Sequence, residues 1–149
     1  GPRIGFVEDS GWDTHAGQAQ VLQRKLSELD AGLRAFHDRA GATWDRTVVA
    51  VVTEFGRTAA VNGTGGTDHG TGGMALLAGG AVRGGRVAGD WPGLAASALN
   101  EGRDLKTTTD MRALFKTLLA GHLRLPESAL ETQVFPDSRS VRGMDGLLV

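Results

Sequence analysis

The sequence predicts an α/β protein with a mostly parallel sheet, because segments of strand composition alternate with segments of helical periodicity. Their order is strand, helix, strand, loop, strand and helix, and a helix between two strands is typical of a parallel sheet. The central strand, residues 47–53 (TVVAVVT), is continuously apolar and rich in β-branched side chains. That composition is typical of a strand buried on both faces, as strands of parallel sheets are.

Short-range patterns predict the first strand and the first helix. Residues 3–7 contain Ile4, Phe6 and Val7, which indicates a buried strand. From Gln18 to about Gly41, apolar residues recur at steps of three and four and form one face of a predicted helix. This face consists of Leu22, Leu26, Leu29, Leu33 and Phe36, and the opposite face carries Arg24, Lys25, Glu28, Arg34 and Asp38.

The remaining elements lie in the second half of the chain. Residues 74–78 are a short apolar run between glycines and predict a third strand. Residues 108–123 have helical periodicity, capping groups precede them at 107–110 (TTTD), and Pro126 follows their end. The buried face of this helix would consist of Met111, Leu114, Phe115, Leu118 and Leu119. Three strands are few for an independent doubly wound domain, so we expect the chain to be part of a larger sheet.

Composition excludes several function classes. A chain of 149 residues has the length of one domain, and we treat residues 1–149 as a single domain or partial domain. The net charge of −1 and the lack of a basic block argue against nucleic-acid binding. The absence of cysteine excludes disulfides, thiolate metal sites and a cysteine nucleophile. No apolar run approaches the roughly 20 residues of a membrane helix.

Three pairs of polar residues follow the predicted strands, where open α/β sheets bind their ligands. They are Asp13 with His15, Glu54 with Arg57, and Asp68 with His69. Carboxylates and imidazoles are ligands for Zn, Mn or Fe, and carboxylates also for Mg or Ca. The sequence therefore predicts a site for a divalent metal ion, whose identity stays open. Arginine is not a ligand but suits bidentate recognition of phosphate, sulfate or carboxylate.

Each pair also has a purely structural interpretation. Asp13 or Thr14 is a candidate N-cap for the first helix, and Glu54 and Arg57 are candidates for a surface ion pair. Asp68 is a candidate Asx-turn residue in its glycine-rich loop. The joint position of the three pairs favours the metal site, whereas His37 and His122, near helix C-termini, are interpreted as structural.

Several motifs carry a resemblance to a known family. In chain order they are GWDTH, TEFGRT, NGTGGTDHG, GGAVRGGRVAGDWP, TTTDMRALFKTLL and VFPD, and they extend from about Asp9 to the end of the chain. Together they resemble the sulfatase-like proteins of domain-of-unknown-function family 1501. The resemblance implies the alkaline phosphatase and sulfatase superfamily and its three-layer α/β/α sandwich. It also implies that this chain corresponds to the C-terminal portion, that an N-terminal half is missing, and that a twin-arginine signal there directs export to the periplasm.

The resemblance also implies roles for individual residues. Asp13 and His15 match the pair that binds the first metal ion, His69 matches the last histidine of that site, and Glu54 stands at a carboxylate of the second. The second site lacks its histidine, because Glu-Phe-Gly-Arg ends the strand where the superfamily has Asp-His. Either the guanidinium of Arg57 replaces a cation there, or the second site is lost. No nucleophile can be assigned.

The expected function is metal-dependent hydrolysis of a small sulfate or phosphate ester. Asp13, His15 and His69 would hold the metal ion, with Glu54 as a fourth ligand or an outer carboxylate. Arg57 would bind the anionic oxygens of the ester, and Asp68 would orient His69. The alternative is a non-catalytic binding or assembly module with a degenerate metal site, because the Asp-His pair and the nucleophile are absent.

Overall fold

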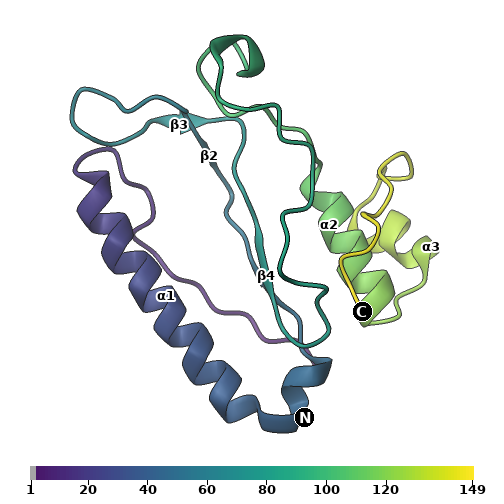
Figure 1. The fold of residues 1–149 in the computed structure, drawn as a ribbon. Helices are drawn as coiled ribbons and strands as arrows, with labels where there is room; N and C mark the ends of the chain where they lie inside the picture. Colours follow the sequence, from purple (N-terminus) through teal and green to yellow (C-terminus); the bar gives the residue numbers. More distant parts are fainter. Residues whose placement is uncertain (1–2) are drawn as a thin grey trace.

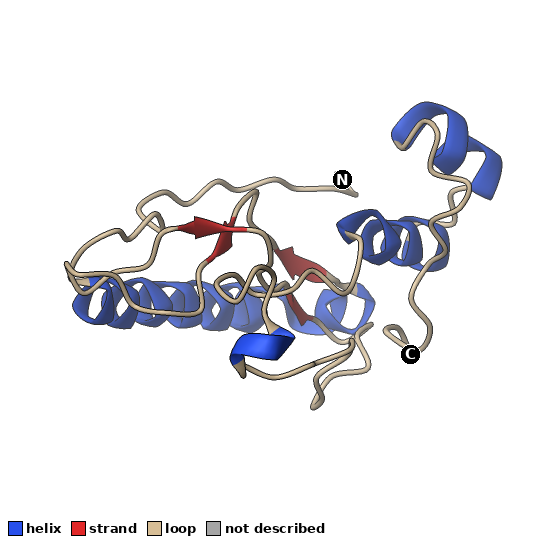
Figure 2. Cartoon of the chain, turned by 90° about the horizontal axis from the view of Figure 1, so that it is seen from above, coloured by secondary structure: helices blue, strands red, loops and turns tan. Residues whose placement is uncertain are grey.

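The computed structural model describes residues 3–149, and loops make up much of the chain (Figures 1 and 2). The helical elements are α1 (Gln18–Ala40), the 3₁₀ turns η1 (Gly41–Arg46) and η2 (Ala96–Ala98), α2 (Met111–Thr117), α3 (Glu127–Ala129), and the π-helical turns η3 (Leu118–His122) and η4 (Leu130–Val134). The strands are β1 (Val49–Val51), β2 (Gly56–Arg57), β3 (His69–Gly70) and β4 (Leu76–Ala78). Figure 1 shows α1 on one side of the molecule, the strands in the middle and α2 and α3 on the opposite side.

The four strands form one long, interrupted hairpin. β1 pairs antiparallel with β4, and β2 pairs antiparallel with β3, so each half of the hairpin is a two-stranded sheet. Between the two ladders the outgoing chain has residues 52–55 and the returning chain has residues 71–75. The returning chain is therefore one residue longer, which shifts the register as a β-bulge does.

The predicted three-layer α/β/α sandwich with a mostly parallel sheet is contradicted by this architecture. In the described part of the chain, the sheets are small and both are antiparallel. Parallel neighbours need a crossover connection, usually a helix, that returns the chain to the starting edge. The segment between β1 and β4 contains no helix and instead folds back on itself through β2 and β3. The two apolar runs therefore meet as antiparallel partners.

The predicted first strand is also wrong. Residues 4–10 have no regular secondary structure, and Ile4, Phe6 and Val7 are 70%, 88% and 90% exposed. The segment extends along much of α1 without joining either sheet (Figure 1). A β-branched, aromatic composition favours extended backbone, but a strand also needs a neighbour that accepts its hydrogen bonds.

Helix α1 has the predicted bounds but not the predicted buried face. It begins after Gly17 and ends at Gly41, whose positive φ of 52° suits glycine at a helix end. Two residues of the predicted apolar face, Leu26 and Phe36, are about half exposed. The buried residue of α1 is Lys25, which the helical pattern assigned to the polar face.

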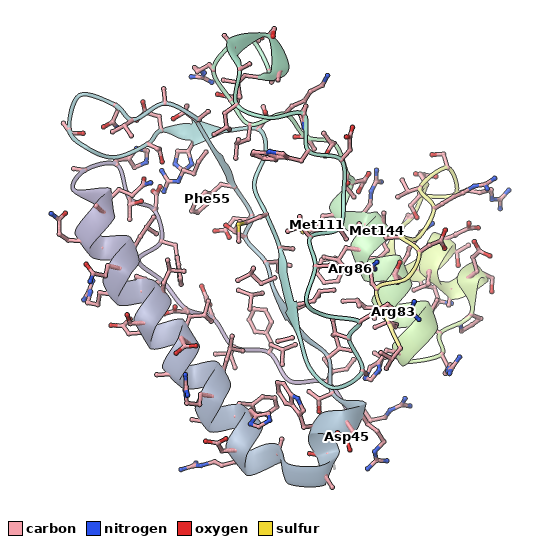
Figure 3. The ribbon with its side chains drawn as sticks, viewed as in Figure 1. Asp45, Phe55, Arg83, Arg86, Met111 and Met144 are labelled. Atoms are coloured by element: carbon pink, nitrogen blue, oxygen red, sulfur yellow. The ribbon has the colours of Figure 1, made fainter. Side chains whose placement is uncertain are left out.

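The core lies between α2 and the β1–β4 sheet. Leu114 and Leu118 pack with Leu147, and partly buried side chains surround them: Val48, Ala50, Leu77, Met144 and Leu148. The C-terminal segment is fixed to the loop after β4, since Arg83 N donates to Leu147 O at 2.9 Å and Arg86 donates to Gly146 O. Figure 3 shows these arginines and Met144 beside that segment.

The chain exposes much more surface than a compact protein of its mass. Its accessible surface is 10280 Å² for 15.6 kDa, whereas a compact monomer of that mass exposes about 7,300 Å². Apolar side chains of the strand region, including Val52 and Met74, contribute to the excess. Among the described residues, no helix has both the length and the apolar character of a membrane span.

Asp110 is the N-cap of α2, and its loss is expected to cost about 1 kcal/mol of stability. Its side chain accepts from Arg112 N at 2.8 Å, and the Arg112 guanidinium lies against its carboxylate. The Arg112 side chain, followed by its backbone N–H, lowers the pKa of Asp110 below the ordinary carboxyl value. Because this pKa is depressed on folding, the charged cap stabilises the fold above the unfolded pKa, and the contribution disappears as the pH falls through the folded pKa.

Thermal melts of the wild type and Asp110→Ala test this expectation. The wild type should melt higher than the variant at pH 7, and the difference should shrink as the medium is acidified below the ordinary carboxyl range. If the difference in melting temperature between the two proteins stays constant down to strongly acidic pH, the charge of Asp110 does not stabilise α2.

Candidate metal centre

The candidate site forms where the loop before α1 meets the closed end of the hairpin. Gly17 N donates to Thr64 O at 3.1 Å, Gln18 N to Gly65 O at 2.8 Å, and Thr67 N to Thr14 O at 3.2 Å. Figure 1 shows the β2–β3 end beside the start of α1. These backbone contacts bring together residues that are about 50 positions apart in the sequence.

Gly66 permits the close approach of the two loops. A Cβ atom at this position would collide with the backbone carbon and oxygen of His15 and with Ala16 N. The carbonyl of His15 accepts from Asn62 Nδ2 at 3.0 Å and from Thr64 Oγ1 at 2.7 Å. The position of His15 is therefore set by the hairpin end as much as by its own loop.

Asp13, His15 and His69 converge on one point. Their ligand atoms all lie within 4.8 Å of one another. His15 Nε2 is 3.0 Å and His69 Nε2 is 3.5 Å from Asp13 Oδ1. All three side chains are about half exposed, at 50%, 44% and 56% for Asp13, His15 and His69. The site is therefore open to solvent on one side.

Two of the distances in this cluster match the spacing of ligand atoms around one metal ion. Ligand atoms about 2.1 Å from a tetrahedral Zn²⁺ are about 3.4 Å apart, and the two distances to Asp13 lie on either side of that value. A carboxylate oxygen and unprotonated ring nitrogens all offer lone pairs, so their approach requires protons or a cation between them. Three protein ligands with an open face are also typical of catalytic zinc sites.

Arg57 connects the two loops beneath Asp13. Its Nη2 donates to Asp13 Oδ1 at 2.6 Å and to Trp12 O at 3.1 Å, and its Nη1 donates to Thr67 O at 2.8 Å. The guanidinium also lies 4.8 Å from the centre of the Phe55 ring. Three of the five donors of Arg57 are thus engaged by the protein, and its side chain is 18% exposed.

Asp68 lies beside His15 rather than His69. His15 Nδ1 is 3.4 Å from Asp68 Oδ1, which also accepts from Asn62 Nδ2 at 3.0 Å. These two contacts, Asn62 first, lower the pKa of Asp68 and keep it ionised. A carboxylate on Nδ1 favours the tautomer whose Nε2 lone pair points at a metal ion.

Aromatic rings support the two histidines. The rings of His15 and His69 meet edge to face, with centres 4.9 Å apart. Phe55 meets His69 at 5.2 Å in the same way. Figure 3 labels Phe55 near the upper end of the strands. The imidazole of His69 thus has a packing partner on the hairpin that limits its rotation.

Glu54 does not belong to this group. In residues 3–149, the cluster that could hold a metal ion is Asp13, His15 and His69, without Glu54. Two of the structural interpretations are also wrong. The N-cap of α1 is Gly17, with no side-chain cap, so neither Asp13 nor Thr14 caps this helix. Arg57 pairs with Asp13 instead of Glu54.

Sequence reasoning missed three residues that organise the site. Asn62 holds both His15 and Asp68, and Trp12 supplies a carbonyl to Arg57. Lys25 reaches the same loop from α1 through Asp9. Asn62 has a weak sequence signal, since Asn followed by Gly marks a turn, but nothing in the helical pattern around Lys25 predicts its burial.

A family model described as "Protein of unknown function (DUF1501)" matches residues 1–134. No curated protein and no solved structure matches the chain. The match covers most of the chain and includes every candidate site residue. It concerns the family alone, so the wider relation to sulfatases and alkaline phosphatases, and export, stay predictions.

Proposed function

The chain belongs to the DUF1501 family, and from that premise we propose that it binds one divalent metal ion and hydrolyses a small sulfate or phosphate ester. The observation that carries the proposal is the convergence of Asp13, His15 and His69 within 4.8 Å. Residues from two distant loops are brought to one point, and each offers a ligand atom. The family description itself assigns no activity.

The residues of the site have separate tasks in this proposal. Asp13, His15 and His69 hold the ion, and Asp68 fixes the ring of His15 from the other side. A bound divalent cation supplies Lewis acidity toward an ester oxygen and makes a bound water more acidic. One ion accounts for the ligands in this cluster, so the site needs no second metal ion.

Arg57 has two tasks in the proposal. Its contacts with Asp13 and Trp12 O hold the carboxylate in place. Two of its five donors have no partner among these contacts and are available to the oxygens of an anionic ester. A guanidinium beside the metal ligands would stabilise negative charge that develops on those oxygens.

One observation favours a second candidate, a non-catalytic metal-binding module. Hydrolytic sites usually exclude bulk water, but the three ligands are about half exposed. Two surface hollows of the described chain are lined by residues from Lys116 onward, and neither includes the cluster. A binding module needs the ligands and the fold but no enclosed substrate pocket.

Two measurements on purified protein test the proposal. Isothermal titration with Zn²⁺, Mn²⁺, Fe²⁺, Mg²⁺ and Ca²⁺ should show one ion bound per chain for at least one of them. The loaded protein should then hydrolyse an aryl sulfate, a phosphomonoester or a phosphodiester, and a chelator should abolish turnover. Binding without turnover of all three ester classes would favour the binding module, and no binding of any ion would refute both.

A further inference from the structure

Lys25 is unusual because it is a buried cation on an otherwise exposed helix. Its side chain is 7% exposed, and it is the buried residue of α1. Lysines are almost never buried unless they are paired, because an ammonium group loses its hydration there. A second lysine of the chain, Lys116, is also buried, but its partners are Ser138 O, Val141 O and the carboxylate of Glu131 in the C-terminal part of the chain. Lys25 lies on α1, on the opposite side of the molecule from α2 (Figure 1).

Lys25 pairs with Asp9, in the segment that leads to the metal ligands, and with Glu28 on its own helix. Its Nζ is 2.5 Å from Asp9 Oδ1 and 3.3 Å from Glu28 Oε2. It also lies 5.3 Å from the centre of the Trp12 ring, and Trp12 Nε1 donates to Asp9 Oδ2 at 2.9 Å. The hydrogen bond between Lys25 and Asp9 raises the pKa of the former and lowers that of the latter, so both are charged at neutral pH.

These contacts end one residue before the first ligand. Trp12 precedes Asp13, and its carbonyl accepts from Arg57. The loop has no regular secondary structure up to the bridge at Ala16, and α1 has no side-chain cap to fix it. Arg57 therefore holds the loop from the hairpin, and Lys25 holds it from α1.

We propose that Lys25 is a positioning residue for the metal site: through Asp9 and Trp12 it fixes the loop that carries Asp13 and His15. The effect expected on Zn²⁺ affinity rests on the proposed metal site, whereas the effect expected on the order of the loop does not. Lys25 contacts neither Asp13 nor His15. It acts through the segment from Asp9 to Trp12, which directly precedes Asp13. Its removal should loosen the ligands without removing one.

The test compares Lys25→Met with the wild type by Zn²⁺ titration and by amide hydrogen exchange of residues 9–16. The variant keeps the aliphatic stem and loses the ammonium group. We expect Zn²⁺ affinity to fall about 10–100-fold, the range for outer partners of metal ligands. Exchange in residues 9–16 should become faster, and Lys25→Arg should restore part of both properties. Asp9→Asn changes the loop partner of Lys25 and leaves α1 unchanged in sequence. It should also lower Zn²⁺ affinity and speed exchange in residues 9–16, and it provides the test if Lys25→Met does not fold.

Two controls separate positioning from general stability. Arg34→Met removes an exposed cation of the same helix that pairs with Asp30, and should change neither readout. Leu130→Ala opens the distant C-terminal core and should lower the melting temperature while Zn²⁺ affinity stays the same. Wild-type affinity and wild-type exchange in Lys25→Met and Asp9→Asn would overturn the inference. If the wild type itself binds no ion, the metal site fails, and the exchange rates still decide whether Lys25 orders the loop.

Discussion

Replacement of His69 by alanine is expected to weaken Zn²⁺ binding by at least about 100-fold. Loss of an outer partner of a ligand already costs about 10–100-fold, and His69 is one of only three candidate ligands in this cluster. Its Nε2 lies 3.5 Å from Asp13 Oδ1, and the remaining pair, Asp13 and His15, would leave a two-ligand site. Isothermal titration at pH 7 measures the loss directly.

The metal-dependent gain in melting temperature should disappear in the same variant. A ligand stabilises the native state only to the extent that it binds to that state. His37→Ala is the matched control, because this histidine lies on α1, pairs with Asp38 and is 55% exposed. Its Zn²⁺ affinity should equal that of the wild type. Equal affinity in His69→Ala and the wild type would show that the convergence of the three side chains is not a metal site.

Gly66→Ala is expected to cost about 1–3 kcal/mol of stability, the usual penalty for an atom forced into a packed region. The added Cβ would meet backbone atoms of His15 and Ala16, which cannot rotate away as a flexible side chain does. The two loops must then separate, and with them the ligands. Zn²⁺ affinity should therefore fall together with stability, although no ligand has been changed.

Gly63→Ala is the control within the same loop. A Cβ at this position meets no heavy atom within 4 Å, so stability and affinity should stay close to those of the wild type. Urea unfolding and Zn²⁺ titration of both variants give the comparison. A Gly66→Ala protein as stable as Gly63→Ala would mean that the loops do not need this close approach.

Local patterns predicted the helices well. The recurrence of Leu22, Leu29 and Leu33 placed the first helix at 18–41, and the structure has it at Gln18–Ala40. The predicted helix at 108–123 appears as α2 continued by η3, with Asp110 as its cap. Helical periodicity and capping depend on residues that are close together in the sequence, so they can be predicted from one sequence.

The direction of strand pairing could not be predicted in this way. The apolar runs at 47–53 and 74–78 do contain strands, but an apolar run does not specify its partner or its orientation. The turn chemistry of residues 62–66 decides the matter, because it reverses the chain between β2 and β3. The parallel prediction ignored this reversal.

The proximity of three of the candidate ligands was predicted from an incorrect fold. The sequence placed the polar pairs together because the carboxyl ends of parallel strands share an edge. The structure brings Asp13, His15 and His69 together for another reason, the docking of the hairpin end on the start of α1. Glu54 lies between β1 and β2 and does not belong to the cluster. Long-range contacts of this kind have no signature in local patterns.

The attachment of α1 has a mechanical consequence. Its 23 residues span about 35 Å, and its first turn is docked on the hairpin end, whereas its last turn continues into η1. Because the helix is attached at both ends, the loop that carries Asp13 and His15 cannot shift far without straining the contacts of η1 at the other end. An ion bound by Asp13 and His15 would therefore add a constraint to the start of α1, which begins three residues after His15.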